Sequence, residues 1–218
     1  MNIRLIIFDF DGTLGDTRRN IVMTLQQTMQ EMHLPVIDEV RCAATIGLTL
    51  KDSFKTLFSQ LTDEEAEECA AIYRRIFEVN KKKMVPQLFP HVAETLAELQ
   101  QHGITMSVAS SRSNASLRGF LKDMGIERYI SYVLGADDVT KPKPDPEPVL
   151  KTLTALGFAA EDTIVVGDMP VDILMGRNAG TRTCGVTYGN ASRQQLEEAG
   201  ANFVIDDLEE LITTIFDE

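Results

Sequence analysis

The chain has 218 residues, of which 44% are hydrophobic and 25% are charged, a balance typical of globular proteins with a substantial core. Its formal net charge of −12 argues against a nucleic-acid partner, and no apolar run approaches the roughly 18–20 residues that a membrane span needs. Three scattered cysteines, Cys42, Cys69 and Cys184, argue against a disulfide framework or a zinc site and favour buried thiols.

The first predicted element is a buried strand over residues 3–8, followed directly by Asp9. Because this apolar stretch is short and meets an acid, it is a poor signal peptide, and we expect a cytoplasmic protein. Residues 16–85 show helical periodicity and no convincing strand. A capping-box pattern at Thr62 and Glu65 opens the last helix of this region. The apolar residues at helical spacing are Ile21, Leu25, Met29 and Met32 in the first helix, and Ala66, Cys69, Ile72, Tyr73 and Ile76 in the last.

From residue 91 to the end, predicted helices and strands alternate. The strands are expected at 104–110, 132–136, 162–168, 182–188 and 202–206, and the helices at 91–103, 114–125, 141–157 (after a proline-rich start), 171–180, 192–200 and 208–216. This alternation predicts an α/β fold, a doubly wound (Rossmann-like) parallel sheet that also contains the opening strand. We expect a catalytic core of residues 1–15 and 86–218, with residues 16–85 inserted after the first strand as an all-helical domain.

Polar side chains follow the predicted strands at their carboxyl ends, where open parallel sheets bind ligands. The candidates are Asp9 and Asp11 after the first strand, Ser110 and Ser111 after the second, Lys141 before the proline-rich helix, and Asp168 and Asp172 after a later strand. Ser110 is preferred over Ser111 because it directly follows the apolar run. The topology would gather all of them at one edge of the sheet.

Carboxylates packed together resist ionisation, and a divalent cation relieves their repulsion. Because the ligands on offer are oxygens and no histidine or cysteine is suitably placed, Mg²⁺ is favoured over zinc. We assign no catalysis to the three histidines. A hydroxyl and a lysine suit a phosphate group, and Gly12 would let backbone N–H groups approach it closely.

Four segments in order, "DFDGTL", "VASS", "KPKPDP" and "GDMPVD", resemble the four motifs of haloacid dehalogenase-like phosphatases. The resemblance covers essentially the whole chain, and the helical insertion lies where such enzymes carry a small cap domain. The segments "LFPHVAETLAEL", "KPKPDPEPVL", "DILMGRNAG" and "GVTYGN" are similar to the phosphoglycolate phosphatase-like subgroup.

This resemblance implies a mechanism in which Asp9 is the nucleophile and forms an aspartyl-phosphate, while Asp11 protonates the leaving group and then activates water. Mg²⁺ would be held by the Asp9 carboxylate, the Asp11 backbone carbonyl and Asp168, with Asp172 as a ligand or an orienting group. It further implies that Ser110 and Lys141 hold the transferring phosphoryl group, and that Ser111 and Arg112 lie near the leaving group.

The glycine-containing segment "TIGLTLKDS", with Gly47 and Lys51, admits two interpretations. It is either a simple interhelical turn or, as the resemblance implies, a specificity loop in which Lys51 meets an anionic part of the substrate.

The expected function is hydrolysis of a small phosphorylated metabolite. Phosphoglycolate is the leading candidate, followed by inorganic pyrophosphate and sugar phosphates. Asp11 argues against carbon–halogen cleavage, the absence of a histidine soon after the first motif argues against phosphomutase activity, and lysines in the insertion leave phosphonate hydrolysis open. A phosphate-binding protein without turnover is the non-enzymatic alternative. Both a monomer and a homodimer remain compatible with the sequence.

Overall fold

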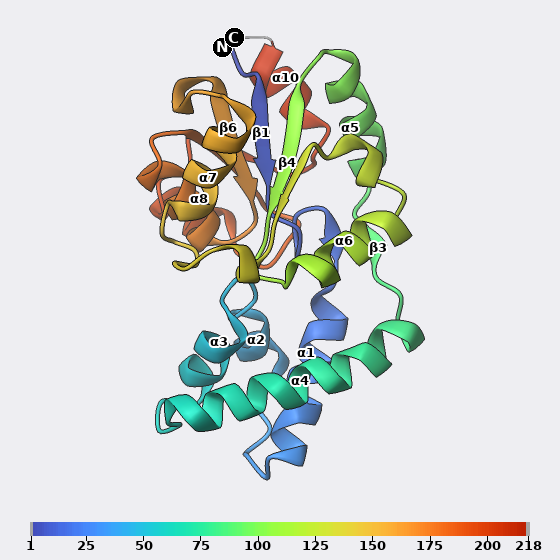
Figure 1. The fold of residues 1–218 in the computed structure, drawn as a ribbon, viewed down its shortest axis with the longest axis vertical. Coiled ribbons are helices and arrows are strands. Elements are labelled where there is room, and N and C mark those ends of the chain that lie inside the picture. Colours follow the sequence, from blue (N-terminus) through green and yellow to red (C-terminus); the bar gives the residue numbers. More distant parts are fainter. Residues whose placement is uncertain (1, 217–218) are drawn as a thin grey trace.

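A six-stranded parallel sheet in the order β5-β4-β1-β6-β7-β8 forms the centre of the computed structural model, which describes residues 2–216 (Figure 1). Its strands are β1 (Leu5–Phe8), β4 (Thr105–Ala109), β5 (Tyr132–Leu134), β6 (Thr163–Gly167), β7 (Arg182–Val186) and β8 (Phe203–Ile205). Strand β1 lies between β4 and β6, so Leu5 pairs with Thr105 on one side and Thr163 on the other. The predicted doubly wound α/β fold is confirmed.

Helices cover both faces of the sheet because alternate side chains of each buried strand point to opposite sides. Ile6 and Phe8 share a core with α5, α6 and α10, whereas Leu5 and Ile7 pack with α7 and α8. These elements are α5 (Val92–Gln101), α6 (Asn114–Asp123), α7 (Glu147–Leu156), α8 (Pro170–Asn178), α9 (Arg193–Glu198) and α10 (Glu210–Phe216), with the short 3-10 turns η1 (Glu127–Tyr129), η2 (Ala136–Asp138) and η3 (Ala160–Asp162) between them.

Four further helices lie beyond the end of the sheet to which the strands point (Figure 1). They are α1 (Arg18–Glu31), α2 (Glu39–Ala43), α3 (Leu50–Leu57) and α4 (Asp63–Lys83). The capping box that begins α4 is confirmed, since the Thr62 hydroxyl accepts a hydrogen bond from the Glu65 N–H and the Glu65 carboxylate accepts one from the Thr62 N–H. Ala66, Cys69 and Tyr73 form part of its buried stripe.

A two-stranded antiparallel ribbon, β2 (Gly15–Asp16) and β3 (Gln87–Leu88), connects the sheet with the helices α1–α4. The sequence does not predict this ribbon, because a strand of two residues is too short to show alternation of apolar and polar side chains. The three cysteines are buried free thiols, as predicted. Within residues 2–216, no helix combines the length and apolar character required to cross a bilayer.

Candidate active site

Three buried acids meet at the carboxyl end of the sheet. Asp9 follows β1, Asp168 follows β6 and Asp172 lies in the first turn of α8. Asp9 is 4% exposed, and the other two are fully buried. Because β1 and β6 are paired in register, the Asp9 N–H donates to the Val166 carbonyl at 2.8 Å, which fixes Asp9 beside the end of β6. One carboxylate oxygen from each acid lies within 4.8 Å of the others, in agreement with the convergence expected of strand ends.

The lysine of this site is Lys143, and the prediction that Lys141 fills this position is wrong. The Lys143 ammonium donates to Asp9 Oδ1 at 2.6 Å and to Asp172 Oδ1 at 2.7 Å, and its side chain is 3% exposed. The Lys141 side chain is 72% exposed and lies 3.8 Å from Asp145. The segment between η2 and α7 has no regular secondary structure, so no periodic pattern determines which lysine points inward. That depends on the path of the backbone past β1.

Burial dominates the electrostatics of the acids. It raises the pKa of Asp9, with Lys143 acting in the opposite direction and the neighbouring carboxylates adding to the rise. Burial and the charge of Asp172 raise the pKa of Asp168 to about 7, although hydrogen bonds from Asn190 oppose this. For Lys143, burial disfavours the ammonium, but the charges of Asp172 and Asp9 outweigh it and raise its pKa. Lys143 therefore stays protonated between two carboxylates.

Asp168 accepts hydrogen bonds from Asn190 and Thr13, neither of which was predicted as a site residue. The backbone N–H and the side-chain amide of Asn190 donate to Asp168 Oδ2 at 2.7 and 2.8 Å. The Thr13 hydroxyl donates to its other oxygen at 3.3 Å. Gly12 has a φ of +94°, and a Cβ there would lie 2.2 Å from Asp168 Oδ2, so only glycine allows this close approach. Asn190 follows β7, so the strand-end rule that found Asp168 could also have found it.

Asp11 forms a multiply hydrogen-bonded ion pair with Arg112 at the same edge of the sheet. Arg112 Nε donates to both carboxylate oxygens of Asp11, at 2.8 and 2.7 Å, and Nη2 donates to Oδ1 at 2.6 Å. The Thr17 hydroxyl donates to Oδ1 at 2.6 Å. Burial disfavours the guanidinium charge, but Asp11 outweighs this by its charge and hydrogen bonds and raises the pKa of Arg112.

The two serines after β4 have different surroundings. Ser110 is buried, and its hydroxyl accepts a hydrogen bond from the Arg112 N–H at 3.2 Å. The Ser111 hydroxyl instead donates to the Gly47 carbonyl at 2.6 Å. Ser111 thus connects the sheet edge with the segment that joins α2 to α3.

A cavity of about 1020 Å³ opens between this sheet edge and the helices α1–α4. Its sheet side includes Asp9, Asp11, Ser110, Ser111 and Arg112, and its helical side includes Gly47, Lys51, Tyr73, Arg74 and Phe77. The Lys51 ammonium forms an ion pair with Asp63 at 2.8 Å, so an anionic ligand would compete with Asp63 for it. Asp9, Asp11 and the segment with Gly47 and Lys51 therefore face the same cavity.

The donor set at the three acids fits a hard divalent cation. When ionised, Asp9, Asp168 and Asp172 carry three negative charges, and Lys143 supplies one positive charge between two of them. The excess of two negative charges is buried, which is costly without a counter-charge. The ligand atoms are all carboxylate oxygens, the type that Mg²⁺ prefers over nitrogen and sulfur.

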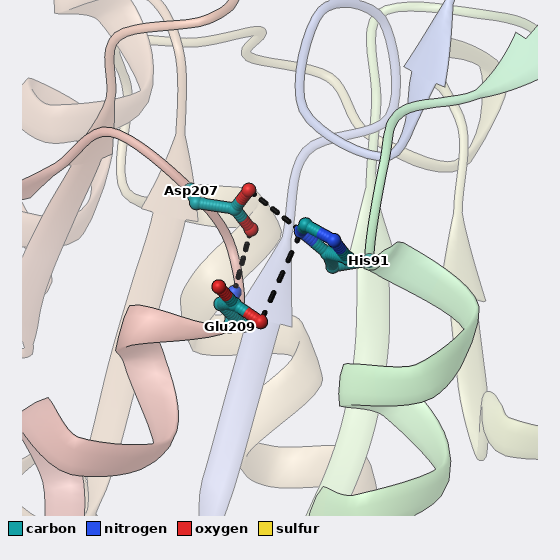
Figure 2. A group of neighbouring side chains, drawn as sticks. All are labelled: His91, Asp207 and Glu209. Atoms are coloured by element: carbon teal, nitrogen blue, oxygen red, sulfur yellow. Dashed lines mark hydrogen bonds and ion pairs between the residues drawn. The ribbon is translucent and has the colours of Figure 1, made fainter.

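A second group of titratable side chains lies away from this cavity. His91 begins α5 with a left-handed φ of 57°, and Asp207 and Glu209 come from the segment between β8 and α10 (Figure 2). His91 Nδ1 lies 2.7 Å from Asp207 Oδ2 and 3.9 Å from Glu209 Oε2. This geometry is that of an exposed ion pair joining the start of α5 to the start of α10.

We expect His91 to titrate above its ordinary value of about 6.5, since its hydrogen bond to Asp207 and the two nearby carboxylates raise its pKa. A folded pKa above the unfolded one means that the pair stabilises the fold below about pH 6.5 and that this contribution disappears as the pH rises through the folded pKa. An NMR titration of the His91 ring checks this, with Asp207→Asn as the matched control. An unchanged pKa in Asp207→Asn would contradict the assignment.

Known proteins share both the sequence and the fold. The family model for haloacid dehalogenase-like hydrolases matches residues 6–186. A probable phosphatase, IndB, of Dickeya dadantii is 37% identical over 95% of this chain and 91% of its own. A phosphoglycolate phosphatase of Photorhabdus laumondii is 31% identical over 98% of this chain and 92% of its own.

The pyrophosphatase PpaX of Oceanobacillus iheyensis is 31% identical over 100% of this chain and 99% of its own. Among crystal structures, a Bacteroides fragilis protein described as a haloacid dehalogenase-like hydrolase superposes with a TM-score of 0.92 at 28% identity, covering 96% of this chain and 99% of the other. With these matches, and with the acids and the lysine at the expected sheet edge, the chain belongs to the haloacid dehalogenase-like hydrolases and is a phosphatase of that family.

Proposed function

We propose that this phosphatase is Mg²⁺-dependent and hydrolyses a small phosphorylated metabolite through an aspartyl-phosphate on Asp9. The observation that carries the proposal is the Asp9 carboxylate itself. It lies at the end of a buried strand, in contact with Lys143, beside two further buried acids and open to the cavity. A side chain so placed can reach a phosphate group that is held at the sheet edge.

The cation would be held by the carboxylates of Asp9 and Asp168 and the backbone carbonyl of Asp11, with Asp172 as a ligand or an orienting group, and when bound it stabilises charge on the phosphoryl oxygens. Ser110 and Lys143 hold the same oxygens from the protein side. Lys143 takes the part expected of Lys141, and its ammonium offsets both the charge of Asp9 and that of the incoming phosphate.

In the first step, an Asp9 oxygen attacks phosphorus, and the bond from phosphorus to the leaving oxygen breaks. Asp11 donates its proton to that leaving oxygen, which departs as a hydroxyl group. In the second step, water attacks the phosphorus of the aspartyl-phosphate while Asp11 accepts a proton from it. Inorganic phosphate is released, the Asp9 carboxylate is restored and Asp11 is protonated again.

We further propose that residues 16–85 act as a cap over a core formed by residues 1–15 and 86–218. The segment with Gly47 and Lys51 would contact the part of the substrate that leaves. The relatives named phosphoglycolate phosphatase and pyrophosphatase support two candidate substrates, phosphoglycolate first and inorganic pyrophosphate second.

The test is kcat/KM for phosphoglycolate, pyrophosphate and several sugar phosphates, each with Mg²⁺ and with a chelator. We expect hydrolysis of at least one of them with Mg²⁺ and none with the chelator, with recovery when Mg²⁺ is restored. Turnover that survives the chelator would overturn the metal dependence. Tight phosphate binding without hydrolysis of any compound would favour the phosphate-binding alternative.

A further inference from the structure

Arg112 donates hydrogen bonds to both oxygens of the Asp11 carboxylate, which must be free for proton transfer in the proposed mechanism. Its three hydrogen bonds to Asp11 span 2.6–2.8 Å, and the two side chains are each 10% exposed. Thr17 donates a fourth hydrogen bond to the same carboxylate. Oδ1 accepts three of these hydrogen bonds and Oδ2 accepts one, so Arg112 and Thr17 hold the carboxylate in a fixed orientation.

The guanidinium is held in an aromatic cage that draws on both the core and the helices above it. The Arg112 Cζ atom lies 5.9 Å from the ring centre of Phe10, 4.7 Å from that of Phe120 and 4.8 Å from that of Phe77 in α4. The negative faces of aromatic rings stabilise a cation. They leave the N–H groups of the guanidinium free to bind an anion that lies in the guanidinium plane. The cage therefore keeps the cation in place when its anionic partner changes.

Arg112 and Asp9 line the same cavity, so an anion bound to Arg112 would lie within the substrate volume. The planar fork of an arginine matches a carboxylate or a phosphate equally well. A substrate with a second anionic group near the leaving oxygen could take over the donors that now hold Asp11. A substrate without such a group would leave Asp11 bound and unable to reach the leaving oxygen.

We propose that Arg112 is the specificity-determining residue of this phosphatase: it binds a second anionic group on the substrate and thereby releases the Asp11 carboxylate, which takes up a proton from water and donates it to the leaving oxygen. The favoured substrates are phosphate esters or anhydrides whose leaving group itself carries a carboxylate or a phosphate close to the bond that breaks. This inference rests on the proposed function, because it takes the role of Asp11 from it.

Two esters that differ in one group provide the test. 2-Phosphoglycolate and 2-hydroxyethyl phosphate share the bond that breaks, but the first carries a carboxylate where the second carries a neutral hydroxymethyl group. We expect the wild-type protein with Mg²⁺ to prefer phosphoglycolate by on the order of 10²-fold in kcat/KM. A buried, charged hydrogen-bond donor such as Arg112 typically discriminates to this extent between an anionic and a neutral group. In Arg112→Met this preference should fall to a few-fold, and Arg112→Lys should restore part of it.

Arg74 of α4 also lines the cavity, so Arg74→Met is the matched control, and it should keep the wild-type preference. Binding without turnover is measured by calorimetry in an Asp9→Asn background, where adding Arg112→Met should weaken phosphoglycolate binding by on the order of 10²-fold. A melting curve establishes that each variant is folded.

The inference fails alone if the wild-type protein hydrolyses both esters equally, if Arg112→Met keeps the full preference, or if Arg74→Met is the variant that loses it. If a sugar phosphate is hydrolysed with Mg²⁺ but neither phosphoglycolate nor pyrophosphate is, the inference also fails alone. If none of these compounds is hydrolysed with Mg²⁺, the proposed function fails and the inference fails with it.

Discussion

Replacing Lys143 by methionine should lower kcat/KM by on the order of 10²–10³-fold, the usual effect of removing one fixed donor from a developing negative charge. Its ammonium contacts Asp9 and Asp172 and is buried, so no other cation within residues 2–216 stands between these two acids. Lys141→Met is the matched control, since it removes the same group two residues away at an exposed position. We expect that control to retain activity within about twofold.

Loss of Lys143 also leaves two buried carboxylates without their cation, which costs about 3–5 kcal/mol in folding free energy when one partner of such a pair is removed. Melting temperatures must therefore accompany the kinetics. Lys143→Arg keeps the charge and should preserve the fold better than methionine does. If Lys141→Met is inactive while Lys143→Met is active, the assignment of the lysine is wrong.

Asp9→Asn should lower kcat by at least about 10³-fold, because an amide oxygen is a poor nucleophile and the covalent intermediate on residue 9 no longer forms. The change keeps the shape of the side chain, so β1 and its buried residues should remain in position. Steady-state phosphate release measures the effect, and mass spectrometry of acid-quenched wild-type protein should locate a phosphoryl group on Asp9.

The matched control is Asp162→Asn, the same carboxylate-to-amide change at the opposite end of the sheet, where Asp162 pairs with Arg4 at 3.8 Å. It should leave kcat within about twofold, since exposed ion pairs contribute little. Substantial turnover by folded Asp9→Asn, or a phosphoryl group trapped on a different residue, would contradict the proposed mechanism.

The acids of the site could be predicted because their positions follow from regular structure. A buried strand ends where its apolar run ends, and parallel strands end at one edge, so Asp9 and Asp168 had to converge. Lys143 could not be distinguished from Lys141, because alternate residues of an extended segment point to the same side and neither hydrophobicity nor period separates them. Only the path of the loop places one of them against β1.

The ion pair between Arg112 and Asp11 could not be predicted from the sequence either. The family resemblance places Arg112 near the leaving group, but the sequence does not pair it with Asp11, because the two residues follow different strands and lie far apart in the chain. The cage around Arg112 includes Phe77, which periodicity could identify only as a residue of a helix. Contacts between the helical part and the core depend on how α4 lies over the sheet, and that orientation has no signature in one chain.

The central position of β1 has a consequence for biosynthesis. Asp9 is synthesised with β1, but β1 pairs with β4 and β6, which are made much later. Closing such long loops is slow and requires most of the chain, whereas α1–α4 can pack against one another as soon as Lys83 has emerged. We expect a nascent chain shorter than about residue 167 to carry Asp9 on a strand that still lacks its β6 partner, so the acids of the site meet only after β6 has been made.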